Sequence, residues 1–141
     1  MDNIKRVLPI RSYKLRNPIV IAFNIHLTHF NAFGTRHYDR LARSLMQHAQ
    51  VQKRKVILLP NITNLEQSIE SRGETLSSTL KHMLKQTGHE KCHLVAHSFT
   101  GVDARAAISL FGAHTHVQSL TTICTPHLGM KLIDEIHSTD K

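Results

Sequence analysis

The stretch from Lys91 to Gly101 constrains the fold more than any other part of the chain. It contains a short apolar run, residues 94–96, of the kind shown by a strand that is buried on both faces. After Ser98 the pattern becomes helical, and several apolar residues fall on one face of the expected helix: Ala104, Ala107, Ile108 and Phe111. A strand, a sharp turn with a serine at its tip and a helix are the layout of a nucleophile elbow.

Ser98 itself allows two interpretations. In a nucleophile elbow the turn holds the serine hydroxyl clear of the sheet, and the first N–H groups of the following helix face a developing oxyanion. In the commoner alternative the serine caps the helix and takes no part in chemistry. Ser98 alone favours the capping interpretation, so the choice depends on the rest of the chain.

Strands and helices alternate along the chain. Strands are expected at 17–23, 56–60 and 117–124, and helices at 35–49 and 65–87, with a last helix over 131–137. Together with the strand and helix around the serine, this gives the order β-α-β-α-β-α-β with short connections. That order predicts the α/β class, with a parallel sheet of about four strands flanked by helices and right-handed crossovers.

Two blocks of sequence resemble a known family. Residues 96–105 read Ala-His-Ser-Phe-Thr-Gly-Val-Asp-Ala-Arg, and residues 119–129 read Ser-Leu-Thr-Thr-Ile-Cys-Thr-Pro-His-Leu-Gly. In order and spacing they are similar to Gly-His-Ser-x-Gly-Gly-x-Asp-x-Arg and Leu-Thr-Thr-Ile-x-Thr-Pro-His-x-Gly. These are the patterns of the serine lipases of the α/β-hydrolase superfamily, specifically the triacylglycerol lipases of bacterial and fungal mitochondrial type. The resemblance implies a partial α/β-hydrolase fold that corresponds to the amino-terminal half only.

The resemblance assigns roles to three residues. It implies that Ser98 is the nucleophile that attacks a carboxylic ester, and that the backbone N–H of Phe99 is one oxyanion donor. The second donor would be the N–H of Leu27, in a loop where His26 and His29 stand at the family's two glycines. No third ligand follows these histidines at a recognisable spacing, so we expect no metal and no cofactor.

The elbow departs from the family pattern at two positions. Ala96 and Thr100 replace the two glycines that flank the serine, and a β-branched residue at Thr100 is expected to cost about 1–3 kcal/mol in a tight turn or to loosen it. Asp103 is expected to be a structural carboxylate, with Arg105 as its nearest candidate partner.

The other members of a catalytic triad are not found at their usual places. In this fold the acid and then the histidine follow the serine along the chain. Only residues 130–141 follow Gly129, so both are expected to be missing from the sequence as given. His127 is the candidate for a surrogate base, because it lies at the same sheet edge as Ser98.

Two functions therefore remain open. The first is a lipase-like serine ester hydrolase for acylglycerols or other carboxylic esters, incomplete as given. The second is a catalytically inactive hydrolase remnant that acts as a binding or interaction module. A third, weaker hypothesis is a basic module that binds nucleic acid or acidic lipid.

Charge and composition bear on the partners. The net charge is +8, from 18 Lys+Arg against 10 Asp+Glu, but the basic residues are spread along the chain and only five Phe and two Tyr are present to stack bases. We therefore expect a lipid or ester substrate and peripheral contact with an anionic membrane, but no nucleic acid. The outer edge of strand 117–124 is expected to be apolar and unpaired, which favours a homodimer.

The domain and compartment follow from the same features. Residues 1–16 are expected to form a basic N-terminal tail, and residues 17–141 a truncated α/β-hydrolase domain. No apolar run approaches the roughly 20 residues that span a bilayer, and the N-terminus lacks the apolar core of a secretory signal. Cys92 and Cys124 are expected to be buried thiols, so the chain is expected to be intracellular, either mitochondrial or cytoplasmic.

Overall fold

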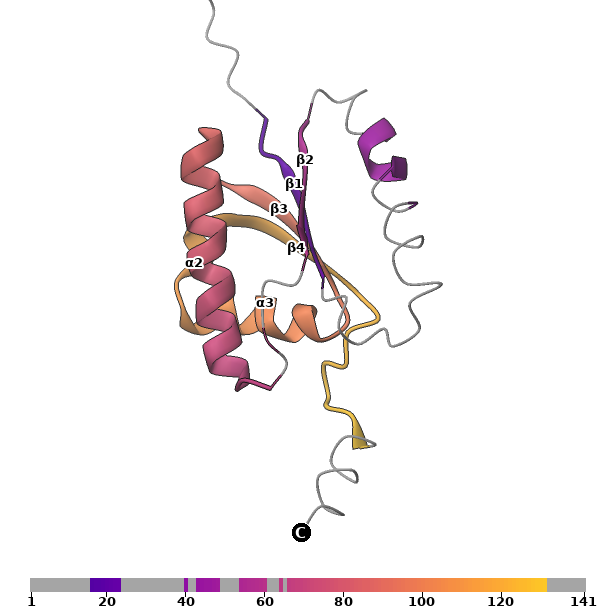
Figure 1. Cartoon of the computed structure of the whole chain (residues 1–141), viewed down its shortest axis with the longest axis vertical. Helices are drawn as coiled ribbons and strands as arrows, with labels where there is room; N and C mark the ends of the chain where they lie inside the picture. Colours follow the sequence, from indigo (N-terminus) through magenta and orange to yellow (C-terminus); the bar gives the residue numbers. More distant parts are fainter. Residues whose placement is uncertain are drawn as a thin grey trace, which may run out of the picture.

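The computed structural model describes residues 16–23, 40, 43–48, 54–60, 64 and 66–131. Its elements are, in chain order, β1 (Ile19–Phe23), β2 (Val56–Pro60), α2 (Ile69–Thr87), β3 (Cys92–His97), α3 (Phe99–Leu110), the 3-10 helix η1 (Ala113–Thr115) and β4 (Val117–Ile123) (Figure 1). Residues 43–48 are also helical and lie inside the helix expected at 35–49. The basic tail to residue 15, Leu27 and the last expected helix beyond Lys131 lie outside the described residues.

The four strands form one parallel sheet in the order β2-β1-β3-β4. The strand that precedes Ser98, β3, is an inner strand and pairs with β1 on one side and β4 on the other. All strands run in the same direction, so β3 and β4 end at the same edge of the sheet. The expected α/β class, with about four parallel strands flanked by helices, is confirmed.

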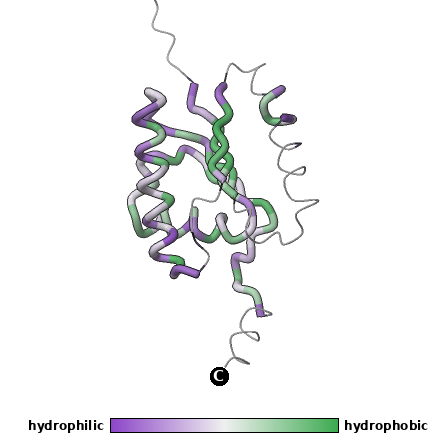
Figure 2. The backbone as a smooth tube through the Cα atoms, in the orientation of Figure 1, coloured by the Kyte–Doolittle hydropathy of each residue, from purple (hydrophilic) through white to green (hydrophobic). Residues whose placement is uncertain are grey.

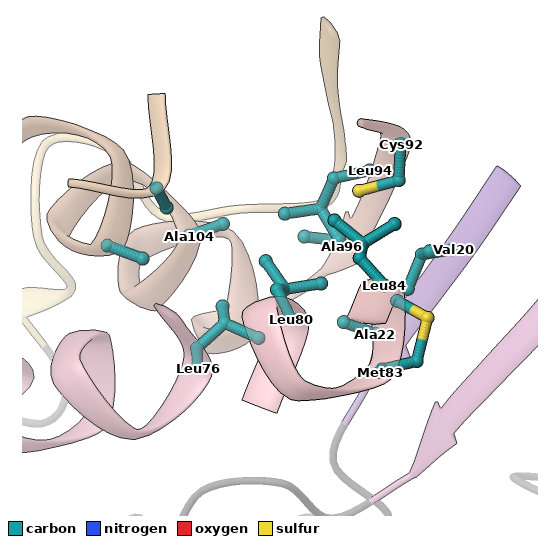
Figure 3. Packing of buried hydrophobic residues seen from close by; sticks show 12 residues of the cluster. Val20, Ala22, Leu76, Leu80, Met83, Leu84, Cys92, Leu94, Ala96 and Ala104 are labelled. Atoms are coloured by element: carbon teal, nitrogen blue, oxygen red, sulfur yellow. The ribbon is translucent and has the colours of Figure 1, made fainter. Parts of the chain in front are cut away.

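The core lies between the sheet and the pair α2 and α3, which cover the same face (Figure 1). The inward strand residues are small or branched, and α2 contributes a stripe of large apolar side chains (Figure 3). The cluster consists of Val20, Ala22, Leu76, Leu80, Met83, Leu84, Cys92, Leu94, Ala96, Ala104, Ala107 and Ala113. In Figure 2 the strands at the centre are the most hydrophobic part of the backbone tube. On the opposite face, Leu45 of the helical residues 43–48 packs against Ile21 and Phe23 of β1.

Helix α2 begins and ends with clear capping interactions. Ser68 precedes it, and the Ser71 N–H donates to the Ser68 hydroxyl oxygen at 3.2 Å. At the other end Gly88 adopts a left-handed conformation with φ 71°, as its place in the sequence predicts. The Gly88 N–H donates to the Lys85 carbonyl and the His89 N–H to the Leu84 carbonyl, which completes a Schellman motif. Because Ser68 caps the start, α2 begins at Ile69, four residues later than the start at residue 65 that the apolar pattern indicates.

A close crossing of α2 and α3 fixes the position of the elbow helix. A Cβ at Gly73 would lie 2.8 Å from the Ala106 Cβ, so only glycine allows the two backbones to approach this far. Next to this crossing, Arg72 Nε donates to Asp103 Oδ1 at 2.8 Å, and both side chains are buried. Arg72 Nη1 also donates to the Gln67 carbonyl at 2.6 Å. The expected role of Asp103 is thus correct, but its partner is Arg72 and not Arg105.

Candidate active site at the carboxyl ends of β3 and β4

Ser98 sits in a strained backbone conformation between β3 and α3. Its φ of 55° and ψ of −134° fall in a region that non-glycine residues rarely adopt. The side chain makes no capping hydrogen bond to the helix, although Ser98 occupies the N-cap position. An N-capping serine has the extended backbone with negative φ that Ser68 shows. Ser98 therefore does not act as a simple helix cap.

Hydrogen bonds from neighbouring segments hold this conformation. The Ser98 N–H donates to the Ile123 carbonyl at 2.9 Å, and the Ser98 carbonyl accepts from the Gly101 N–H at 3.0 Å. The same carbonyl accepts a hydrogen bond of 2.9 Å from the hydroxyl of Thr125. Because Ile123 ends β4 and Thr125 follows it by two residues, the elbow is held by the end of the adjacent strand and the segment after it, and not by its own turn alone.

Phe99 is the first residue of α3. Its N–H belongs to the first turn, where N–H groups have no acceptor within the helix, and the helix dipole adds partial positive charge there. An oxyanion donor needs these two properties. The second expected donor, Leu27, lies outside the described residues.

The two positions that depart from the family glycines behave differently. Ala96 is fully buried on the core face of β3, where a methyl group packs within the cluster. Thr100 is 2% exposed, and its hydroxyl has no hydrogen-bond partner among the described residues. The backbone of Thr100 is helical, so the strain at the turn falls on Ser98 and the cost at Thr100 arises from its buried hydroxyl.

His127 is held by two side chains at the surface. Arg105 Nη1 lies 3.2 Å from His127 Nδ1, and Thr122 Oγ1 lies 3.0 Å from His127 Nε2. Arginine can only donate, so Nδ1 accepts and Nε2 carries the proton that it donates to Thr122. The lone pair of this neutral ring is therefore engaged with Arg105, on the helix that follows Ser98.

Cys92 and His93, at the start of β3 and at the opposite end from Ser98, have shifted pKa values. Burial raises the pKa of the Cys92 thiol to about 11. Burial, and secondly the charge of Arg54, lower the pKa of His93, whose Nδ1 lies 2.8 Å from the Ser119 hydroxyl. Cys124 is exposed, which corrects the expectation that both thiols are buried. Its exposure follows from its position, because it turns the chain after β4 with a φ of 51°.

Sequence reasoning missed the residues that support the elbow. Thr125 and Gly101 belong to the two blocks that carry the family resemblance, but no local pattern indicates that they touch. Arg72 is likewise linked to Asp103 only by the crossing of α2 and α3. Within the described ranges, no group of three or more His, Cys, Asp or Glu could hold a metal ion. No described helix has the length and hydrophobicity required to cross a bilayer.

Similar sequences are found over half of the chain, although no protein-family model matches it. A triacylglycerol lipase of Pseudarthrobacter phenanthrenivorans is 37% identical over 70 residues, which cover 50% of this chain and 21% of that lipase. A triacylglycerol lipase of Burkholderia plantarii is 37% identical over 70 residues, covering 50% of this chain and 19% of the relative. The matched region therefore spans 21% and 19% of the length of these two curated relatives, about a fifth of each.

Solved structures share the fold over most of the chain. The mature form of the Bacillus licheniformis lipase BlEst2 superimposes with a TM-score of 0.66 at 20% identity, covering 97% of this chain and 50% of that one. Its propeptide form gives a TM-score of 0.62 at 20% identity, covering 86% and 25%. The four-stranded parallel α/β fold expected from the sequence is confirmed, and this chain matches half of the length of that lipase structure.

Proposed function

Because this chain is similar in sequence to triacylglycerol lipases over half of its length, we propose that it is the nucleophile-bearing part of a lipase-type serine ester hydrolase. Ser98 is the proposed nucleophile, and the N–H of Phe99 is the proposed oxyanion donor. Since the matched region covers only 21% and 19% of these relatives, we propose that the chain corresponds to part of a larger catalytic unit.

The observation that carries this proposal is the backbone of Ser98. A non-glycine residue in this region costs about 1–3 kcal/mol and persists only where the surroundings enforce it. Here the hydrogen bonds from Gly101 and Thr125, and the bond to Ile123, enforce it at the end of an inner parallel strand. Such a turn presents a hydroxyl at the edge of the sheet where ligands of α/β proteins bind.

The proposed reaction is acyl transfer to Ser98. The Ser98 hydroxyl oxygen would form a bond to the ester carbonyl carbon, while its proton passes to a base. The carbonyl oxygen becomes an anion that accepts a hydrogen bond from the Phe99 N–H, and Leu27 is the proposed second donor. Collapse of this intermediate breaks the bond to the alcohol, which leaves with a proton, and water then releases the acid.

The base is the open element of this mechanism. His127 is the candidate within the described residues, but its lone pair is engaged with Arg105 and its proton with Thr122. To act on Ser98 the ring would have to release Arg105. We therefore propose that the complete catalytic unit takes its base from outside the described residues. His127 would replace that base only if its ring released Arg105.

The proposed substrate is a lipid or another carboxylic ester. In addition to the relatives, one feature of the surface supports this: the segment after β4 exposes Leu128 fully and Met130 to 40%. Lys131 follows directly, so apolar and cationic side chains stand together beyond the strand end that supports Ser98. An arrangement of this kind suits peripheral contact with an anionic lipid surface.

A fluorophosphonate probe tests the proposed nucleophile in the full chain. We expect covalent labelling at Ser98, detected by mass spectrometry of the peptide that contains it. Labelling should disappear in Ser98→Ala and remain in Ser78→Ala, which removes an exposed hydroxyl from α2. If the protein is folded by circular dichroism and remains unlabelled, Ser98 is not a working nucleophile in this chain. That result would leave the inactive remnant, a binding or interaction module, as the function.

A further inference from the structure

The peptide unit between Ser98 and Phe99 is anchored through its carbonyl oxygen. This oxygen accepts two hydrogen bonds, from the Thr125 hydroxyl at 2.9 Å and from the Gly101 N–H at 3.0 Å. The peptide unit is planar, with its C=O and N–H pointing in opposite directions. A fixed direction for the Ser98 carbonyl therefore fixes the direction of the Phe99 N–H, which is the proposed oxyanion donor.

Thr125 is seated so that its hydroxyl can make this bond. A Cβ at Gly101 would fall within 2.1 Å of Thr125 Oγ1 and 2.7 Å of its Cγ2, so the threonine fills the space that a side chain at 101 would occupy. Directly before it, Cys124 turns the chain with a φ of 51°. Ser98 and Cys124 are the two non-glycine residues with positive φ among the described residues, and they lie at the ends of adjacent strands.

We infer that Thr125 is a positioning residue, which orients the Phe99 N–H toward the oxyanion by holding the Ser98 carbonyl from the neighbouring strand. The inference rests on the proposed function of Ser98, but its physical content is a statement about one peptide unit. Thr125 acts through the backbone and has no contact with the reacting atoms.

Three variants separate the hydroxyl from the packing of Thr125. Thr125→Val keeps the shape that packs against Gly101 and removes the donor. Thr125→Ser keeps the donor and restores the bond. Thr115→Val is the matched control, because it makes the same chemical change in a hydroxyl that donates to another backbone carbonyl, that of Gly112, at the opposite end of β4.

The first measurement is the second-order rate constant of fluorophosphonate labelling at Ser98. Removal of a whole oxyanion donor typically costs about 10²–10³-fold, so misdirection of one donor by Thr125→Val is expected to cost roughly tenfold. Thr125→Ser should label at the wild-type rate, and Thr115→Val should do the same. If Thr125→Val labels as fast as wild type, the inference is wrong while the nucleophile stands.

The second measurement does not require any reactivity. The ¹⁵N order parameter of the Phe99 amide reports how firmly this N–H is oriented, with about 0.85 typical of rigid backbone. We expect it to fall in Thr125→Val, to recover in Thr125→Ser, and to stay unchanged for Ala107 in the middle of α3. If the order parameters change in this way but the probe does not label the protein, the positioning role of Thr125 is supported and the proposal that Ser98 is the nucleophile is rejected. An unchanged Phe99 amide in Thr125→Val overturns the inference; if this variant does not fold, Thr125→Ala takes its place.

Discussion

At the scale of single residues, the buried hydroxyl of Thr100 is the clearest unfavourable feature of the elbow. Its oxygen has no hydrogen-bond partner among the described residues, and the residue is 2% exposed. A buried polar group left unsatisfied costs about 1–3 kcal/mol, whereas an apolar group of the same shape has no such cost. The Thr100 hydroxyl therefore lowers the stability of the fold, and no hydrogen bond within the described residues offsets that cost.

We predict that Thr100→Val raises the free energy of unfolding by about 1–3 kcal/mol, because valine keeps the shape and removes the unsatisfied hydroxyl. Urea denaturation followed by circular dichroism measures this as a higher midpoint with an unchanged slope. Thr75→Val is the control, since that hydroxyl is exposed and donates to the Ser71 carbonyl within α2. A Thr100→Val variant no more stable than wild type would mean that the hydroxyl has a partner outside the described residues.

At the scale of elements, the position of α3 depends on the ion pair between Arg72 and Asp103. The pair joins the first turn of α2 to the first turns of the elbow helix, next to the crossing that Gly73 permits. Removal of one partner of a buried ion pair takes away the opposite charge that it supplies, which costs about 3–5 kcal/mol. That is a large share of the roughly 5–15 kcal/mol that stabilises a typical domain.

We predict that Arg72→Gln lowers the free energy of unfolding by about 3–5 kcal/mol. Arg105→Gln is the matched control: Arg105 is exposed, and its loss should change stability by about 0.5 kcal/mol or less. The urea midpoints of the two variants show whether Arg72 or Arg105 is the partner of Asp103. If Arg72→Gln does not fold, a difference in soluble yield between the two variants gives the same answer. Equal effects of the two substitutions would contradict the buried pair.

The elements show how far sequence reasoning reaches. The end of α2 was predictable, because a glycine after an apolar stripe is a local signal for a left-handed cap. Its start was not, because Leu65 continues the apolar pattern, whereas the capping bond depends on Ser68. The partner of Asp103 was misjudged for a similar reason: residues two apart on a helix face different sides, and the true partner comes from another helix.

In the candidate site, too, the residues that are local in sequence could be predicted, and those that come from another element could not. The serine, the turn and the following helix are contiguous in sequence, so the local pattern and the family resemblance are enough to predict Ser98 and Phe99 as candidates. The support of the elbow comes from β4, some 25 residues later, through Thr125 and the Ile123 carbonyl. A single sequence carries no local trace of such contacts.

At the scale of the whole molecule, the sheet leaves β4 as an edge. In the part of the chain that the structure describes, β4 pairs only with β3, so a row of N–H and C=O groups faces outward. The exposed side chains of β4 are polar rather than apolar as expected: Gln118, Ser119 and Thr121. Polar side chains reduce aggregation, but they do not remove the unpaired backbone groups that drive pairing with another strand.

We predict that the full chain forms a dimer in which two copies of β4 pair around a two-fold axis. Such an axis makes the strands antiparallel and brings the middle of β4, next to Thr121, against its own copy. Thr121→Lys would place like charges opposite each other and should raise the dissociation constant at least roughly tenfold. Thr75→Lys, with the same substitution on the exposed side of α2, should leave the dissociation constant unchanged.

Because each copy carries a net charge of +8, added salt should strengthen the dimer. Sedimentation equilibrium at two salt concentrations measures all three effects, and a wild-type monomer at every concentration would contradict pairing through β4.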